Sequence, residues 1–419
     1  MQRLFERLKN SSVGRSFLAL SFWQMTNYLV PLVTMPYLIR TIGTEKFGLI
    51  SYIQAFLYYF IVFVDFGFST TAVREISIAR NDTVALTRIF YTTIFTKLLL
   101  GLISLVIIIT VILFVPRFRD HWQSYIMGFS LVIGQVLFPV WFFQGIEKMK
   151  YITYLNFVAK LIFAILLFVL VRGANDYPFA LAAQGIGLII ASLIGIMIIK
   201  LRFKIKFYWP HSAMLVKEIK SGFPILISNF SVTAYNSSLY LLVGFYENDQ
   251  VLGVYSIAEK ITALIRQILS TFSQAIFPRV CSLVTQGQAE LRKFWRKILM
   301  PFAIGIVSIC LLVCIFSSTV VTLVTGDNLS ETAKLLSVII WVPVIVYFNI
   351  PSFQILLAYN YKTVVMQVLT ASSLFSIVLS WFLVPRFSIL GAAYSLIITE
   401  CIITLSLFVM LKKKLHFTF

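Results

Sequence analysis

Long apolar runs separated by short polar stretches follow one another along the whole chain. A transmembrane helix needs about 20 predominantly apolar residues, and about twelve such runs occur here. The pattern predicts an all-α polytopic membrane protein with about twelve transmembrane helices. The predicted spans are 16–38, 47–69, 89–114, 124–145, 151–172, 178–200, 222–245, 252–277, 298–325, 332–357, 363–384 and 389–411.

Basic residues gather in every second connection between the spans. Cytoplasmic loops of membrane proteins carry an excess of Lys and Arg, so this side is predicted to be cytoplasmic, and both termini lie on it. The basic connections are 1–15, the loops near 70–88, 146–150, 201–221, 279–297 and 358–362, and the tail at 412–414.

Composition supports the membrane class. The chain is 59% hydrophobic and only 12% charged, whereas soluble domains are about 45–50% apolar and about 25% charged. A net charge of +19 would suggest nucleic acid in a soluble protein. Here the basic loops explain it through topology and contact with anionic membrane lipids, so we expect no nucleic-acid partner.

The two halves of the chain share a weak repeat. Three pairs of identical residues lie 205 positions apart: Gly48 and Gly253, Ser51 and Ser256, and Arg74 and Arg279. With six spans in each half, the halves have the same orientation, an arrangement common in transporters. We predict an N-terminal six-helix bundle at 1–200, a cytoplasmic basic linker at 201–221 and a C-terminal six-helix bundle at 222–419, with a central cavity between the bundles.

The eighth predicted span carries charges that lipid does not tolerate. An ionisable residue in a membrane helix costs roughly 2.5–3.5 kcal/mol on insertion scales and is a functional candidate. Glu259 and Arg266 are seven residues apart, so they share a helix face, and Lys260 lies on the adjacent face. The face either lines a wet cavity or forms an internal ion network that only holds helices together.

Other spans add polar side chains to the predicted cavity. Hydroxyls, amides, aromatic faces and the charges of Lys260 and Arg266 together suit a glycan that bears a phosphate group. Three carboxylates are candidates for coupling to a proton or Na⁺: Asp65, Glu259 and Glu400. The further candidate cavity residues are Gln24 and Asn27 in the first span, Tyr52 in the second, and Asn229 and Asn236 in the seventh.

Motifs for chemistry are missing from the sequence. It has no Walker A, HExxH or GxSxG sequence, its three His lie in loops or the tail, and its four Cys form no CxxC pair. We therefore expect no enzyme activity, no catalytic residue, no cofactor and no metal site.

Several stretches resemble the polysaccharide-biosynthesis flippase family of the multidrug/oligosaccharidyl-lipid/polysaccharide exporter superfamily. They are PYLIRTIGTEKFGLISY at 36–52, DFGFSTTAVREIS at 65–77, FQGIEKMKY after the fourth span, GVYSIAEKI in the eighth and FPRV before the next cytoplasmic loop. Single motifs are weak, but the ordered set covers most of the chain.

The resemblance implies a flippase for the O-antigen or capsule repeat unit in the bacterial inner membrane. Its substrate would be undecaprenyl-pyrophosphate-linked oligosaccharide, moved from the cytoplasmic to the periplasmic leaflet, and the polymerase and chain-length regulator of the pathway would be partners. In related flippases cavity cations take the pyrophosphate. Arg266 and Lys260 suit that role, with Arg74 and Arg279 at the cytoplasmic mouth.

Two other functions stay open from the sequence. A cation-coupled multidrug antiporter of the same superfamily would use acidic residues such as Asp65 and Glu259, although the net basic cavity disfavours cationic drugs. A membrane-embedded glycan polymerase or ligase usually keeps a sizeable outer loop, and no predicted outer loop exceeds about ten residues.

Overall fold

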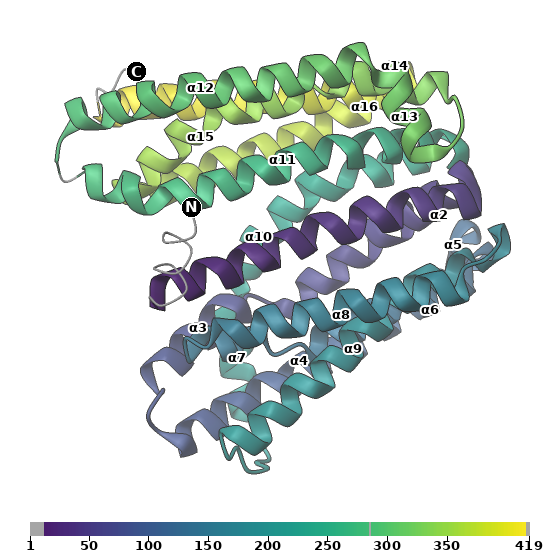
Figure 1. Ribbon diagram of the computed structural model, residues 1–419. Coiled ribbons are helices and arrows are strands. Elements are labelled where there is room, and N and C mark those ends of the chain that lie inside the picture. The colour runs from purple at the N-terminus through teal and green to yellow at the C-terminus, as the bar shows by residue number, and fades with distance from the viewer. Residues whose placement is uncertain (1–11, 285, 416–419) are drawn as a thin grey trace. The chain divides into compact units, whose positions relative to one another are not determined.

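A computed structural model describes residues 12–284 and 286–415, and their side chains except at 12–29, 228, 232, 235, 236, 275, 278 and 298–300. This part of the chain is helical and contains no strand (Figure 1), which confirms the predicted all-α class. Eight of its helices are long and apolar enough to cross a membrane. The count of twelve spans and the cytoplasmic termini stay predictions.

The helices form two compact units by their packing. One contains the described residues of Met1–Gly43 and Ile53–Thr233, and the other contains those of Thr44–Tyr52 and Ala234–Phe419. The division of the sequence into two six-helix bundles joined by the linker 201–221 stays a prediction, because the packing units need not coincide with the halves of the sequence.

The first unit is built mainly from the helices that precede residue 203. A short 3₁₀ helix, η1 (Ala174–Asp176), lies between α8 (Met149–Leu170) and α9 (Tyr177–Arg202). The helices are α2 (Ser12–Asp65), α3 (Phe68–Ile78), α4 (Thr83–Phe114), α5 (Pro116–Asp120), α6 (Trp122–Leu137), α7 (Val140–Gly145), α8 (Met149–Leu170), α9 (Tyr177–Arg202) and the first part of α10 (Ser212–Tyr246).

Helix α9 packs closely against both α6 and α8. A Cβ atom at Gly185 would lie 1.9 Å from Oγ of Ser130 in α6, and one at Gly187 would lie 2.4 Å from the carbonyl oxygen of Ala159 in α8. Small residues at such crossings let helix backbones approach, which is how helices associate where lipid supplies no hydrophobic drive.

Helix α4 exposes a stripe of apolar side chains along the predicted third span. Leu102, Val106 and Leu113 lie on one side of this helix, and each is more than 60% exposed. A water-facing helix rarely presents such a stripe, whereas lipid favours it. The predicted third span therefore has the surface of a lipid-facing helix.

Two very long helices each contain two predicted spans. Helix α2 is interrupted at Gly43, whose φ of 81° is readily adopted only by glycine, and the break falls between the first and second spans. Helix α16 (Lys362–Leu415) is interrupted in the same way at Ser388, with φ 52° and ψ −133°, between the last two spans.

The second unit contains the later helices. Helix α11 packs against α14 and α15, and α15 packs against α16. Its helices after α10 are α11 (Asp249–Val284), α12 (Gln288–Ile315), α13 (Ser317–Thr325), α14 (Ser330–Ile339), α15 (Val342–Ala358) and α16.

Two repeat-related glycines contact each other within the second unit. A Cβ atom at Gly48 would lie 2.2 Å from the carbonyl oxygen of Asp249, and one at Gly253 would lie 2.1 Å from that of Thr44. Thr44 and Asp249 are also 205 positions apart, so the two contacts are equivalent under the repeat. Residues that match in the sequence repeat thus make equivalent backbone contacts in the structure.

Candidate functional site

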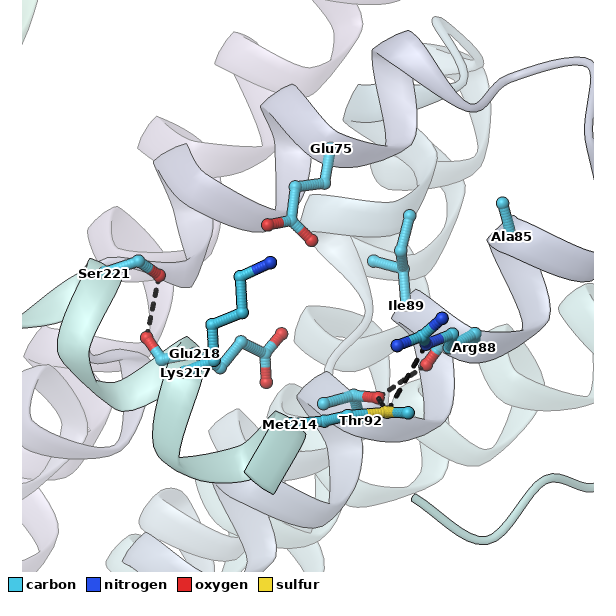
Figure 2. Close-up of a pocket in the computed structure, with 9 residues that line it drawn as sticks. All are labelled: Glu75, Ala85, Arg88, Ile89, Thr92, Met214, Lys217, Glu218 and Ser221. Atoms are coloured by element: carbon cyan, nitrogen blue, oxygen red, sulfur yellow. Dashed lines mark hydrogen bonds between the residues drawn. The ribbon is translucent and has the colours of Figure 1, made fainter. Parts of the chain in front are cut away.

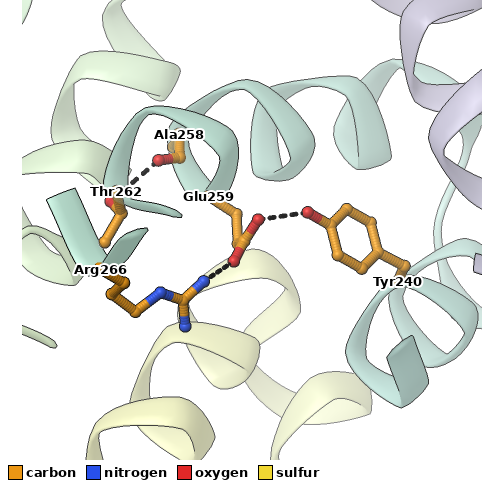
Figure 3. Close-up of polar contacts among 5 residues, drawn as sticks. All are labelled: Tyr240, Ala258, Glu259, Thr262 and Arg266. Carbon is orange, nitrogen blue, oxygen red and sulfur yellow. Dashed lines mark hydrogen bonds and ion pairs between the residues drawn. The ribbon is translucent and has the colours of Figure 1, made fainter. Parts of the chain in front are cut away.

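Helix α11 carries the central polar group of the second unit. Arg266 forms an ion pair with one carboxylate oxygen of Glu259, two turns away on the same helix face. The hydroxyl of Tyr240, on α10, donates a hydrogen bond to the other carboxylate oxygen (Figure 3). The side chains of Arg266 and Glu259 are only 21% and 12% exposed, so the ion pair compensates in part for the burial of both charges.

A cavity of about 260 Å³ lies beside this ion pair. Arg266 is the cation in its lining, and Glu400 of α16 is the carboxylate there. Hydroxyl and amide groups complete the polar part of the wall, and the rest is apolar. The lining residues are Arg266, Leu269, Ser270, Ser273, Val346, Asn349, Ile350, Phe353, Leu369, Glu400, Ile403 and Leu407.

The cavity wall suits an anionic group with hydrogen-bonding oxygens. The planar guanidinium of Arg266 presents donors in the fork geometry that matches phosphate. Ser270 and Ser273 continue the same face of α11, as the spacing in the sequence predicts. The ion pair with Glu259, the alternative considered from the sequence, is also present, so Arg266 has an internal partner beside the cavity.

Lys260 has different surroundings from Arg266. Its ammonium lies 4.4 Å from the centre of the Phe47 ring, which is the geometry of a cation–π interaction. Phe47 is itself buried in the second unit. The two cations predicted to bind phosphate together are therefore directed differently: Arg266 lines the cavity, and Lys260 covers an aromatic ring.

Two more predicted residues belong to the second unit. Tyr52 is buried and fits against Gly244, where a Cβ atom would come within 2.3 Å of its ring. Arg279 is exposed near the end of α11. These positions make Tyr52 a packing residue and leave Arg279 accessible to solvent or headgroups.

Three predicted residues lie in the first unit. Asp65, at the end of α2, accepts a hydrogen bond of 2.9 Å from the hydroxyl of Ser69. Arg74 is exposed on α3, and Asn229 is half-buried on α10. The side chains of Gln24, Asn27 and Asn236 lie outside the described residues. The roles predicted for all these residues, and the central cavity between the halves, stay predictions.

Several residues of the site were not predicted from the sequence. Tyr240 and Asn349 were not singled out, although a polar residue inside the predicted tenth span was a visible signal for Asn349. Gln354 of α15 was missed as well. Its amide donates to the hydroxyl of Ser273 at 2.8 Å and so fixes one wall residue of the cavity.

The fold matches those of two membrane proteins of known structure. It matches an inward-facing multidrug resistance MATE family transporter of the MOP superfamily with a TM-score of 0.76 and 13% identity, over 95% of this chain and 97% of that one. It matches the lipid II flippase MurJ in an inward closed conformation with a TM-score of 0.71 and 13% identity, over 94% and 87% of the two chains. The protein has the fold of this superfamily.

Sequence similarity then gives the family. The chain belongs to the polysaccharide biosynthesis protein family, whose model matches residues 13–284, and the MatE model matches 224–382. It is 29% identical to the "Putative O-antigen transporter" of Escherichia coli (strain K12) over 94% of this chain and 95% of the relative. The protein of the same name from Shigella dysenteriae is 25% identical over 90% and 95%. The resemblance inferred from the motifs is confirmed.

Proposed function

We propose that the protein is a flippase that moves a lipid-linked oligosaccharide across the bacterial inner membrane by alternating access. The observation that carries this proposal is Arg266, a largely buried cation of α11 at the wall of a cavity. Family membership and the names of the O-antigen transporter relatives support the choice of an undecaprenyl-pyrophosphate-linked repeat unit as substrate.

Arg266 has to exchange partners to bind a phosphate group. In the structure its guanidinium pairs with Glu259, which neutralises both charges. A diphosphate carries more charge than one carboxylate and accepts several hydrogen bonds, so it competes for the guanidinium. The hydroxyl of Tyr240 stays on Glu259 and keeps that carboxylate hydrogen-bonded when Arg266 turns away.

The transport step needs no covalent chemistry. A lipid-linked sugar unit changes leaflet without making or breaking a bond, so the protein has to supply a path for the polar headgroup and nothing catalytic. The exposed apolar stripe of α4 is suited to contact with membrane lipids. The polymerase and the chain-length regulator of the same pathway stay predicted partners.

The experiment compares surface polysaccharide in a deletion strain that carries each variant. Arg266→Ala should abolish surface polysaccharide while the protein still inserts, and Arg266→Lys should retain part of it because the charge remains. Arg296→Ala is the matched control, since Arg296 is an exposed arginine of the second unit outside the cavity lining. Normal polymer in Arg266→Ala cells would remove Arg266 from the mechanism.

The deletion strain itself separates the three functions considered from the sequence. Loss of a flippase leaves single lipid-linked units on the inner leaflet. Loss of a polymerase still lets single units reach the cell surface, and loss of a drug antiporter changes drug susceptibility with normal polysaccharide. Either of the last two results contradicts the proposal.

A further inference from the structure

A second cavity, of about 350 Å³, lies entirely within the first unit and shares no lining residue with the cavity described above. It is formed between α3, α4 and the start of α10 (Figure 2), at the ends of spans that are predicted to face the cytoplasm. Its lining residues are Glu75, Ala85, Arg88, Ile89, Thr92, Met214, Lys217, Glu218 and Ser221. The function proposed above uses none of them.

Glu218 is the buried carboxyl of this cavity. It precedes the predicted seventh span and is only 8% exposed, yet it lines the cavity. One carboxyl oxygen accepts a hydrogen bond of 2.5 Å from the hydroxyl of Thr93, and the other lies 2.9 Å from the hydroxyl of Thr96. Two side chains from α4 therefore enclose a single carboxyl from α10.

The hydrogen bonds around Glu218 fit both of its protonation states. The Thr96 hydroxyl also lies 2.8 Å from the carbonyl oxygen of Thr92, and it has one proton to donate. When Glu218 is charged, Thr96 donates to the carboxylate. When Glu218 is protonated, it donates to Thr96, which turns its own proton to Thr92. The heavy atoms keep their places in both states, so binding a proton requires only hydroxyl rotation.

Charged groups from each element that packs against Glu218 face the same cavity. Glu75 comes from α3, Arg88 from α4 and Lys217 from α10, and Figure 2 shows the Lys217 ammonium and the Glu75 carboxylate pointing toward one another. Lys97, one turn beyond Thr93 on α4, instead donates to the carbonyl oxygen of Gln135 at 2.7 Å.

Burial is the main influence on the proton affinity of Glu218. It raises the pKa of the carboxyl from 4.5 to about 7, while the hydrogen bonds from Thr93 and Thr96 act to lower it and the charge of Glu75 acts to raise it. A group with this pKa exchanges its proton at the pH of the cytoplasm.

We propose that Glu218, with Thr93 and Thr96, is a reversible proton-binding site that the cavity connects to the cytoplasm. The proton bound at a carboxyl oxygen passes to a water molecule in the cavity, which leaves the carboxylate with donors from both threonines.

The position of Glu218 in the chain links this site to the transport cycle. Helix α10 is continuous from Ser212 to Tyr246, but its residues up to Thr233 belong to the first unit and those from Ala234 to the second. The hydrogen bonds of Glu218 therefore hold the beginning of α10 against α4. The later part of the same helix carries Tyr240, which belongs to the second unit. This coupling rests on the proposed function, whereas the proton site itself does not.

The proton site is tested on the purified full chain in lipid nanodiscs. Infrared difference spectra over a pH series should show a protonated carboxyl band that titrates near neutral pH. Glu218→Gln should abolish the band, because the amide fits the neutral arrangement but cannot titrate. Glu75→Gln should retain it, since Glu75 is an exposed carboxyl of the same cavity. Thr93→Val should move the midpoint to higher pH.

Coupling is tested in inverted membrane vesicles whose lipid-linked units carry a radioactive sugar. An imposed proton gradient should stimulate translocation in the wild type and in Glu75→Gln, and the stimulation should be lost in Glu218→Gln. A band that persists in Glu218→Gln overturns the proton site, and unchanged stimulation in that variant overturns the coupling. If wild-type vesicles translocate nothing under any condition, the proposed function fails, and the infrared titration still decides the proton site.

Discussion

Gly48 and Gly253 pack backbone against backbone, each against the turn that precedes the other. The contact is reciprocal because the two residues occupy the same place in the two repeats. Neither position has room for a side chain. The match at this spacing therefore reflects a packing requirement.

Gly48→Ala should destabilise the protein. The added Cβ would meet the main chain of Asp249 and Gly253, which cannot rotate away, and overpacking of this kind costs roughly 1–3 kcal/mol. Gly305→Ala is the matched control, because no atom lies within 4 Å of a Cβ there and alanine favours a helix. Thermal unfolding in detergent should show a lower midpoint for the first variant alone, and equal midpoints would contradict the close contact.

The Glu259–Arg266 pair should behave differently in stability and in transport. Glu259→Gln or Arg266→Gln alone leaves one buried charge without its partner, which costs roughly 3–5 kcal/mol. The double variant removes both charges and should recover most of that stability. Surface polysaccharide should stay absent in the double variant, because the cavity has lost its guanidinium. The measurements are the thermal midpoint and the level of surface polymer in the wild type, the two single variants and the double variant. Surface polymer in the double variant would contradict the assignment of Arg266 as the cation that binds the substrate.

Ser388→Gly should stabilise the protein. Ser388 interrupts α16 with φ 52° and ψ −133°, a backbone conformation that costs a residue with a Cβ roughly 1–3 kcal/mol. Glycine adopts it freely, although part of the gain is offset by the greater entropy of the unfolded chain. The thermal midpoint should rise in Ser388→Gly and fall in Ser388→Val, and the reverse order would show that the bend is not strained.

Stability should depend on pH through Glu218. Its pKa in the folded protein is about 7, above the ordinary value of 4.5, so the folded state binds more protons between these values. The contribution of Glu218 to the free energy of unfolding is then fully present below about pH 4.5 and is lost as pH rises toward 7. The free energy of unfolding of Glu218→Gln should lack this decline. The difference in free energy of unfolding between the variant and the wild type should therefore change in favour of the variant by roughly 3 kcal/mol across that window. A constant difference between the two proteins at all pH values would contradict the shift.

The fold class was predictable from the sequence because bilayer thickness sets the length of the apolar runs. Each predicted span falls within a helix or a pair of consecutive helices, except that 151–172 runs two residues past the end of α8 at Leu170. The interruptions at Gly43 and Ser388 were also predicted as boundaries, even though regular helix continues on both sides. Hydrophobic pattern and loop charge carry this information locally.

The contacts of the candidate site were only partly predictable. The pairing of Glu259 with Arg266 follows from helix periodicity, since both lie on α11. The hydroxyl of Tyr240 and the amide of Asn349 come from other helices, and their approach depends on how those helices rotate and cross. Glu218 was missed for a related reason. It lies in a polar segment predicted to be cytoplasmic, where a carboxylate is ordinary, and its contacts with Thr93 and Thr96 depend on how α4 packs against it.

The internal partner of Arg266 also sets a threshold for what the cavity accepts. Glu259 is a competitor tethered seven residues away, and its local concentration does not change with conditions in the cell. A monovalent inorganic ion has to displace this carboxylate with no more charge than the carboxylate itself has. A diphosphate offers more charge and more acceptor oxygens, so the resident carboxylate works as a filter against the small anions that are abundant in cytoplasm.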